Sequence, residues 1–272
     1  MKIAAVQMVS SPSLPDNLHA ARALVQQAAD QGVELVALPE YFCGLGLRDT
    51  DKLAYAEVYG SGPIQEALSA WAAQYGVWLV GGTLPLRAPT AGRVFNTSLL
   101  FSPQGDCMAR YDKVHLFRFA TDRERYDESQ VVQSGDRPVT VRITDRSGQT
   151  WTLGLSVCYD LRFPELYRAQ AAEGADMLLV PSAFTHTTGQ AHWEVMLRAR
   201  AIENQCYVLA PAQGGIHDNG RHTWGHSMLV DPWGQVQAQH CAEGAAVVLG
   251  DLDRAFLRQV RQQLPALEHR VL

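Results

Sequence analysis

The sequence lacks any paired cysteine motif and any long apolar run. Its five cysteines are widely spaced and form no C-x-x-C pair, which argues against a zinc ribbon or a dithiol redox site. No stretch approaches the ~18 apolar residues of a membrane span. The apolar stretch at residues 3–8 is too short for a signal-peptide core. We therefore expect a cytoplasmic, reducing setting and no membrane partner.

The sequence also lacks an excess of basic residues. It has 23 lysines and arginines against 28 acids, for a net charge of −5. A protein that binds nucleic acid requires a basic surface. Hydrophobic residues make up 47% and charged residues 19% of the chain, as in ordinary globular proteins. A length of 272 residues allows one large domain or two small ones. We favour a single domain over residues 1–272 and no nucleic-acid partner.

Short strand-like segments alternate along the chain with segments of helical periodicity. This alternation predicts a layered α/β domain. Residues 118–137 are charged and irregular, so we expect a loop with a short helix there. We expect Asp16 to cap the first helix and Gly32 to end it. The predicted strands are residues 3–8, 34–38, 77–80, 98–101, 107–111, 151–157, 177–180, 206–210, 228–230 and 245–249, and the later helices are 64–75, 164–173, 192–204 and 253–263.

Cys158 follows a predicted apolar strand and is soon followed by Pro164, a residue that suits the first turn of a helix. A cysteine between a strand end and a helix N-terminus experiences the helix dipole and free backbone N–H groups. Those N–H groups can bind a developing oxyanion. The arrangement is similar to a nucleophile elbow, although the G-x-S-x-G sequence is absent. The position makes Cys158 a candidate nucleophile.

Glu40 and Lys113 also follow predicted strands. Ligands of α/β sheets gather at the carboxyl ends of the strands, so a base, a cation and a nucleophile could face one crevice. Taken singly, Glu40 could instead begin a helix and Lys113 could be a solvated surface lysine. The combination of the two with Cys158 favours a catalytic site.

Three segments that contain these residues resemble the signature blocks of the nitrilase superfamily, in matching order and spacing. They are residues 37–42, 111–117 and 156–166. The resemblance implies a four-layer αββα sandwich, a homodimer assembled through helices near Trp193 and Leu166, and neither a cofactor nor a metal. Further similar segments are residues 5–8, 191–194, 198–204, 225–228 and 231–234.

The resemblance also implies a role for each matching residue. Glu40 corresponds to the general base, Lys113 to the lysine that stabilises the oxyanion, and Cys158 to the nucleophile. The backbone N–H of Tyr159 would be a second oxyanion donor. A thiol with a pKa near ~8.5 is mostly neutral at neutral pH and needs such a base.

A second acid accompanies this triad in the family. Glu128 is its best match, and Glu124 and Asp127 are alternatives in the same segment. One departure is Arg118, which stands where many relatives carry an acid and places the chemistry of this substrate loop in question. The candidate substrate-binding residues are Tyr41, Arg162, Phe184 and Thr185.

Within the superfamily, residues 180–184, 202–207, 212–215 and 263–270 are similar to the deaminated-glutathione amidase branch. This implies a small amide substrate with carboxylates, cleaved to 2-oxoglutarate and cysteinylglycine. The alternatives are an ω-amidase, a carbamoyl-hydrolase, a true nitrilase, and a non-catalytic binding member of the fold. The last is disfavoured because Glu40, Lys113 and Cys158 are all intact.

The nine histidines offer two rival interpretations. A papain-like Cys–His pair is disfavoured because no histidine lies in a recognisable protease signature. His217, His222 and His226 match no metal-binding motif, and we take them as surface or hydrogen-bonded side chains. Residues 44–46 do not form a dinucleotide fingerprint, because no third glycine follows at the required spacing.

Overall fold

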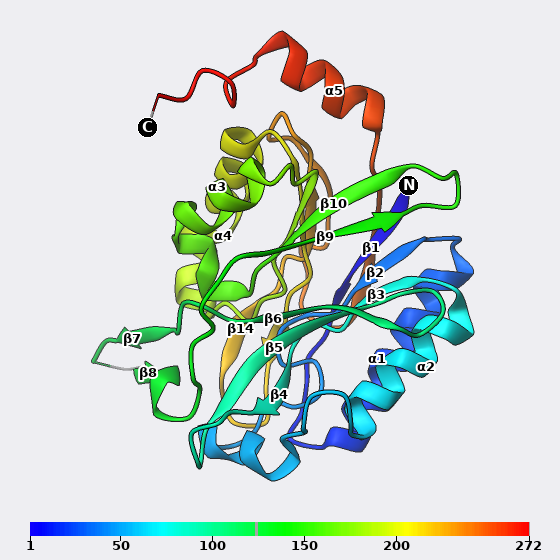
Figure 1. The fold of residues 1–272 in the computed structure, drawn as a ribbon. Helices are drawn as coiled ribbons and strands as arrows, with labels where there is room; N and C mark the ends of the chain where they lie inside the picture. The colour runs from blue at the N-terminus through cyan, green and yellow to red at the C-terminus, as the bar shows by residue number, and fades with distance from the viewer. Residues whose placement is uncertain (123–124, 272) are drawn as a thin grey trace.

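Two β-sheets packed face to face between layers of helices form the framework of the protein (Figure 1). The computed structural model describes residues 1–122 and 125–271. The first sheet has the order β17-β1-β2-β3-β5-β4, with β6 paired to β5. Its strands are β1 (Lys2–Gln7), β2 (Leu35–Ala37), β3 (Trp78–Val80), β4 (Leu84–Arg87), β5 (Val94–Phe101), β6 (Cys107–Asp112) and β17 (Ala246–Asp251).

The second sheet has the order β16-β15-β12-β11-β10-β9. Like β1, β2 and β3 in the first sheet, the central strands β10, β11 and β12 are parallel. Its strands are β9 (Val139–Thr144), β10 (Thr150–Leu155), β11 (Met177–Leu179), β12 (Tyr207–Ala210), β15 (Met228–Val230) and β16 (Val236–Gln239). Two small antiparallel pairs are β7 (Arg118–Ala120) with β8 (Arg125–Asp127), and β13 (Gly214–Ile216) with β14 (His222–Trp224).

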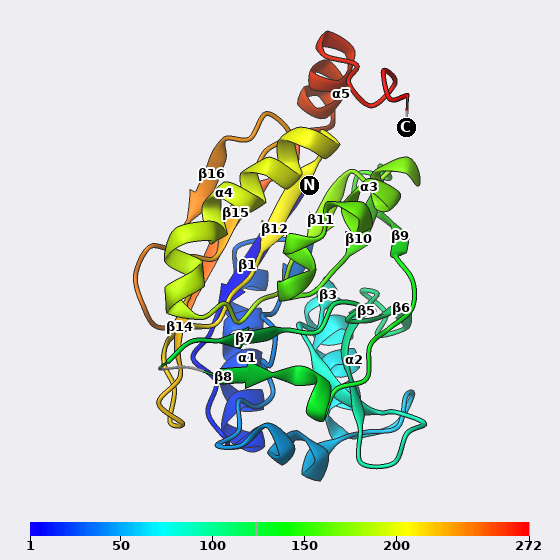
Figure 2. The ribbon, with the colours of Figure 1, turned by 90° about the vertical axis from the view of Figure 1, so that its left-hand side faces the viewer.

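The helices cover the outer faces of both sheets, which completes the predicted αββα sandwich (Figures 1 and 2). Contacts connect α1 and α2 with the first sheet and α3 and α4 with the second. The helices are α1 (Leu14–Asp30), α2 (Pro63–Tyr75), α3 (Pro164–Ala172), α4 (His186–Asn204) and α5 (Arg254–Gln263), and the 3-10 helices are η1 (Asp49–Tyr55), η2 (Glu128–Gln130) and η3 (Cys158–Arg162).

Side chains that alternate along β1 show how the layers pack. Ile3 and Ala5 belong to the core cluster that contains the strands of the second sheet. Ala4 and Val6 point the other way, into a cluster with Val25 of α1. Because successive side chains of a strand point to opposite faces, a continuous apolar segment is what a strand buried on both faces requires.

The beginnings of two helices differ from the prediction. The cap of α1 is Ser13, whose hydroxyl accepts from the N–H of Asp16 at 3.5 Å, so the expectation that Asp16 is the cap was wrong. Asp16 instead lies in the first turn, where its charge suits the helix dipole. Helix α4 begins at His186 rather than at residue 192, and Thr185 caps it. Gly189 allows this first part of α4 to pack closely on Trp224, because a Cβ there would lie 2.2 Å from the Trp224 side chain.

Short strands account for most of the elements that the sequence did not predict. Residues 118–137 contain the expected short helix, η2, but also the β7–β8 pair. Strands β4, β9, β13, β14 and β16 were likewise not predicted. Most of these strands are partly exposed, so their sequences lack the apolar runs of the central strands.

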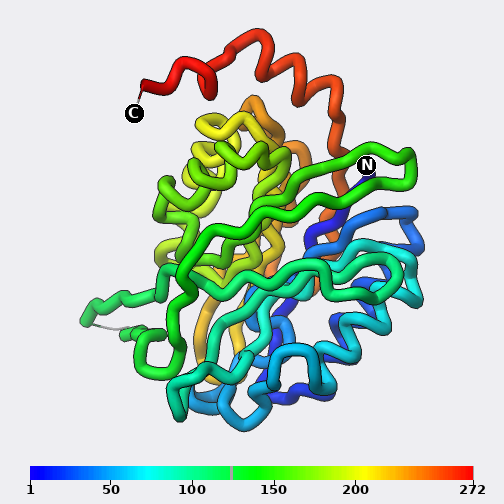
Figure 3. The backbone as a smooth tube through the Cα atoms, in the orientation of Figure 1, coloured from blue at the N-terminus to red at the C-terminus, as the bar shows by residue number. Residues whose placement is uncertain are grey.

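The chain termini lie away from the β7–β8 pair. Both termini and α5 lie toward one end of the molecule, while β7 and β8 lie in its other half (Figures 2 and 3). Arg261 of α5 donates to the carbonyl of Gln205 at 3.0 Å, which attaches this helix to the end of α4. Within the described ranges, no helix combines the length and the apolar character needed to cross a bilayer.

Candidate active site

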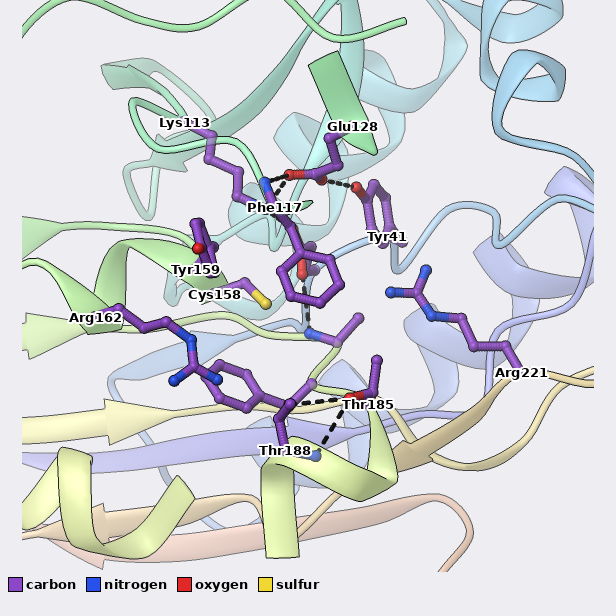
Figure 4. A pocket seen from close by; sticks show the side chains of 13 residues that line it. Tyr41, Lys113, Phe117, Glu128, Cys158, Tyr159, Arg162, Thr185, Thr188 and Arg221 are labelled. Atoms are coloured by element: carbon purple, nitrogen blue, oxygen red, sulfur yellow. Dashed lines mark hydrogen bonds and ion pairs between the residues drawn. The ribbon is translucent and has the colours of Figure 1, made fainter. Parts of the chain in front are cut away.

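One pocket brings together the predicted base, cation, second acid and nucleophile (Figure 4). Glu40 follows β2, Lys113 follows β6, Glu128 begins η2 and Cys158 begins η3. The pocket contains about 300 Å³ of space, part of which is open to solvent. The remaining residues that line it are Tyr41, Phe117, Tyr159, Arg162, Ala183, Phe184, Thr185, Thr188 and Arg221.

Lys113 lies between two carboxylates and is almost completely buried. Its Nζ is 2.9 Å from Oε1 of Glu40 and 2.8 Å from Oε2 of Glu128, and its side chain is 1% exposed. Burial lowers the pKa of Lys113, but the charges of Glu128 and Glu40 more than offset this and hold the pKa well above its usual value. Lys113 therefore remains a cation in the closed pocket.

Hydrogen bonds to both oxygens fix the orientation of the Glu40 carboxylate. Oε1 accepts from Nδ2 of Asn96 at 2.9 Å in addition to Lys113. Oε2 accepts from the backbone N–H of Ala183, also at 2.9 Å. These three donors hold the buried carboxylate in one orientation. Glu40 can accept a proton in a defined direction.

Glu128, rather than Asp127, is the second acid against Lys113. Its Oε2 also accepts from the N–H of Phe117 at 2.6 Å, and its Oε1 accepts from the hydroxyl of Tyr41. Burial raises the pKa of Glu128, but Lys113 and Lys52 lower it, and the net pKa is below its usual value.

The two other candidates for the second acid differ in placement. Asp127 turns away from the cation and accepts from the N–H and hydroxyl of Ser129 at 3.2 and 2.5 Å. Its carboxylate therefore caps η2 and does not line the pocket. Glu124 lies outside the described residues.

Cys158 occupies a strained turn at the end of β10. Its φ of 50° lies in the left-handed region, which is uncommon for residues other than glycine and recurs at active sites. Its N–H donates to the carbonyl of Pro181 at 3.0 Å. Burial raises the pKa of the thiol, as does the charge of Glu40, while Lys113 lowers it, and the net pKa is well above its usual value. The thiol of Cys158, the candidate nucleophile, is therefore neutral at rest.

Asp160 holds this turn against the segment that carries Lys113, and it was not singled out from the sequence. It is completely buried. Its Oδ2 accepts from the N–H of Val157 at 2.9 Å and from the hydroxyl of Tyr111 at 2.7 Å. Its Oδ1 accepts from the N–H of His115 at 3.0 Å. The donors lie far apart in the sequence, so only its position next to the nucleophile could have indicated this role.

The predicted substrate-binding residues all line the pocket. Some of their polar groups remain available to bind a ligand. The guanidinium of Arg162 lies 5.5 Å from the ring of Phe184 and 3.3 Å from Nδ1 of His192. Within residues 1–122 and 125–271 it pairs with no carboxylate. Thr185 and Thr188, whose hydroxyls are 2.9 Å apart, stand at the N-terminus of α4. This end of the pocket can bind an anion.

Several pocket residues escaped the sequence analysis. Phe117 is the last residue of the block that contains Lys113 but was given no role, and Thr188 lies in a part of α4 that was not expected to be helical. Arg221 lies among the histidines that were weighed as metal ligands. The backbone N–H of Tyr159 donates to no acceptor within the described ranges, so it is available to a bound group.

The histidines near Arg221 have partners of their own. The two ring nitrogens of His217 lie 2.8 Å from the carbonyl of Ser10 and 2.8 Å from the hydroxyl of Thr223. His222 pairs with Glu243 at 2.6 Å. No cluster of three or more His, Cys, Asp or Glu side chains in the described part of the chain is arranged to bind a metal ion.

Comparison with known proteins finds similarity over nearly the whole chain. A family model described as carbon–nitrogen hydrolase matches residues 2–262. A Synechocystis protein named deaminated glutathione amidase is 46% identical, over 98% of this chain and 97% of its own length.

Solved structures agree with this similarity. The NitFhit protein of Caenorhabditis elegans has a TM-score of 0.88 at 38% identity, and the match covers 99% of this chain but only 65% of that one. An amidase from Nesterenkonia sp. AN1, described as belonging to the nitrilase superfamily, has a TM-score of 0.79 at 28% identity, with 97% of this chain and 98% of that chain covered. In that structure acrylamide has added to the active-site cysteine.

Proposed function

The chain belongs to the carbon–nitrogen hydrolase family of the nitrilase superfamily, and from this premise we propose that it is an amidase acting through Cys158. The observation that carries the proposal is the buried Glu40–Lys113–Glu128 cluster beside a neutral thiol in one pocket. A base, a fixed cation and a nucleophile are what hydrolysis of an amide through an acyl-enzyme requires.

In the first half of the reaction, the sulfur of Cys158 attacks the amide carbon while Glu40 takes the thiol proton. The C–N bond then breaks, and protonated Glu40 delivers that proton to the departing amine, which leaves a thioester on Cys158. In the second half, Glu40 takes a proton from water, and the resulting hydroxide attacks the thioester carbon. The C–S bond then breaks, Glu40 returns the proton to the sulfur of Cys158, and the carboxylic acid product departs.

Lys113 and the N–H of Tyr159 would stabilise the negative oxygen of the tetrahedral intermediate. Lys113 is held by two carboxylates, so its ammonium is preorganised and does not need to move during the reaction. The free N–H of Tyr159 adjoins the nucleophile. One oxyanion donor of this kind is typically worth about 3–4 kcal/mol.

We propose deaminated glutathione as the substrate, cleaved to 2-oxoglutarate and cysteinylglycine. The similarity to the Synechocystis protein of that name supports this choice. So does the unpaired guanidinium of Arg162, beside Phe184 and near Thr185, which suits the carboxylate of the 2-oxoglutaryl half. Thr188 would add a hydroxyl to the same subsite.

The test is release of 2-oxoglutarate from deaminated glutathione, assayed beside 2-oxoglutaramate, a carbamoyl amine and a simple nitrile. We expect the highest kcat/KM with deaminated glutathione and no detectable turnover by Cys158→Ala. Cys241→Ala, which removes an exposed cysteine that does not line the pocket, should retain full activity. Full activity in Cys158→Ala, or a preference for another member of the panel, would contradict the proposal.

We also propose a homodimer and a cytoplasmic location for this single-domain chain. The core cluster shared by the two sheets supports one domain. Trp193 and Leu166 are already buried within one chain, but Val195 and Ile202 of α4 are 70% and 51% exposed and offer an apolar face for a second copy. Free cysteines agree with a reducing compartment. A monomer by light scattering at micromolar concentration would contradict the dimer.

A further inference from the structure

Arg221 enters the pocket from the turn between β13 and β14, and its charge pairs with no carboxylate among the described residues. Its Nε is buried and donates no hydrogen bond within the described residues. It pairs with no carboxylate there, and its guanidinium carbon lies 4.7 Å from the ring centroid of Tyr126. A buried donor without an acceptor costs about 1–3 kcal/mol. An unpaired guanidinium in a ligand cavity therefore indicates an anion that the free protein lacks.

Two other partly buried arginines show the usual arrangement in this protein. Arg200 pairs with Glu203 at 2.8 Å, and Arg254 pairs with Asp176 at 2.7 Å. Arg162 and Arg221 differ because both line the active-site pocket and neither has a carboxylate partner in the part of the chain that the structure describes. Among those residues, the pocket thus carries two cations without a carboxylate partner, in addition to the paired Lys113.

The two guanidinium groups lie on opposite sides of the Cys158 sulfur (Figure 4). A second hollow, whose space of about 300 Å³ is partly open to solvent, shares Tyr41 and Arg221 with the pocket. A surface hollow also includes Arg221. An amide centred on Cys158 would therefore have its acyl half toward one guanidinium and its amine half toward the other, on the side of these hollows.

We propose that Arg221 binds a carboxylate on the amine half of the substrate. The chain would then select amides whose leaving amine ends in an acid, such as a dipeptide, over amides that release ammonia. This inference rests on the proposed amidase function. The guanidinium of Arg221 already packs on the ring of Tyr126. Its N–H groups can therefore bind a carboxylate with little further loss of side-chain conformational entropy.

The competing explanation is that Arg221 only braces its own turn by packing on Tyr126. A substrate that differs from deaminated glutathione only at the glycine carboxylate separates the two explanations. The probe is deaminated glutathione with a C-terminal carboxamide. The measured quantity is the preference ratio, defined as kcat/KM for the free acid divided by kcat/KM for the carboxamide.

We expect a preference ratio of about 10 to 100 in the wild type, the range for a hydrogen-bonded charge pair. Arg221→Gln should bring the ratio close to one, mainly through a higher KM for the free acid, and Arg221→Lys should retain part of it. Arg162→Gln should lower kcat/KM for both substrates by similar factors and keep the ratio. Arg258→Gln, at an exposed residue of α5 that does not line the active-site pocket, is the matched control and should leave both values unchanged.

A wild-type ratio near one overturns the inference even if Arg221→Gln fails to fold. An unchanged ratio in folded Arg221→Gln overturns it as well, as does a ratio lost in Arg162→Gln and kept in Arg221→Gln. If the wild type hydrolyses the free acid and the carboxamide of deaminated glutathione with equal kcat/KM, the amidase proposal stands and only this inference fails. If it hydrolyses neither, the proposed substrate fails, and the inference fails with it.

Discussion

Lys113 and Glu40 form an ion pair of 2.9 Å in which each side chain is only 1% exposed. A second carboxylate, from Glu128, lies 2.8 Å from the same ammonium. Removing one member of a buried ion pair leaves an uncompensated charge and is strongly destabilising. The groups proposed for catalysis therefore also contribute to folding, and each variant requires a measurement of stability beside its kinetics.

Lys113→Met tests whether this cation acts on the oxyanion. We expect kcat to fall by about 10²- to 10³-fold with a smaller change in KM, because the interaction strengthens only in the transition state. The free energy of unfolding should also fall, by about 3–5 kcal/mol, because Glu40 and Glu128 would face each other without a cation. Steady-state kinetics and thermal melting on the same preparation measure both effects.

A double variant separates the two effects of Lys113. Lys113→Met combined with Glu128→Gln removes one of the two repelling carboxylates, so part of the lost stability should return. The value of kcat should not recover, because the oxyanion still lacks its cation. A near-normal kcat in Lys113→Met would instead show that Lys113 is only the centre of a structural ion pair.

The ionisation of Cys158 is a second test. Burial and Glu40 raise the pKa of this thiol and Lys113 lowers it, so Glu40→Gln should lower the pKa and Lys113→Met should raise it further. The ultraviolet thiolate band, taken as the difference from Cys158→Ser, reports this pKa directly. At pH ~8 the wild type should show almost no Cys158 thiolate. A full thiolate signal at that pH would contradict a role for Glu40 in removing the thiol proton.

Glu40→Gln should slow both halves of the reaction. The amide keeps the size of the carboxylate, but it cannot take a proton from the thiol or from water. If loss of the base slows hydrolysis of the thioester more than its formation, an acyl-enzyme will accumulate and appear by mass spectrometry as 2-oxoglutaryl added to Cys158. Glu57→Gln is a control at another buried glutamate outside the pocket. Normal turnover by Glu40→Gln would exclude it as the base.

The sequence predicted that Glu40, Lys113 and Cys158 converge, because each of them follows a strand. Strands of this kind can be recognised in the sequence from their apolar segments. Arg221 and Asp160 could not be assigned this way. Asp160 acts through donors on β6, on the segment after β6 and on Val157, which lies between β10 and η3. Arg221 reaches the pocket from a turn between two very short strands. Thr188 was missed because Thr187, Thr188 and Gly189 are poor helix formers, and packing against Trp224 decides the start of α4.

Glu128→Gln should reduce activity less than Glu40→Gln. Glu128 contacts Lys113, the N–H of Phe117 and the hydroxyl of Tyr41, and none of these contacts needs Glu128 to transfer a proton. The amide oxygen can still accept from Lys113 and Phe117, and the amide nitrogen can donate to the hydroxyl oxygen of Tyr41. We expect kcat to fall by about 10-fold, within the range for loss of one charge-assisted hydrogen bond. A loss equal to that of Glu40→Gln would indicate a direct proton-transfer role.

The pH dependence of stability provides an independent test of the Glu128–Lys113 pair. The folded-state pKa of Glu128 lies below its usual value because the charges of Lys113 and Lys52 outweigh burial. A carboxylate with a lowered pKa stabilises the fold above its unfolded-state pKa, and that stabilisation is lost as the pH falls through the folded-state pKa. Wild type should therefore melt above Glu128→Gln at neutral pH, and the difference in melting temperature should shrink on acidification below pH ~4.3, the usual value for glutamate. A difference that stays constant with pH would show that packing, rather than charge, accounts for the contribution of Glu128.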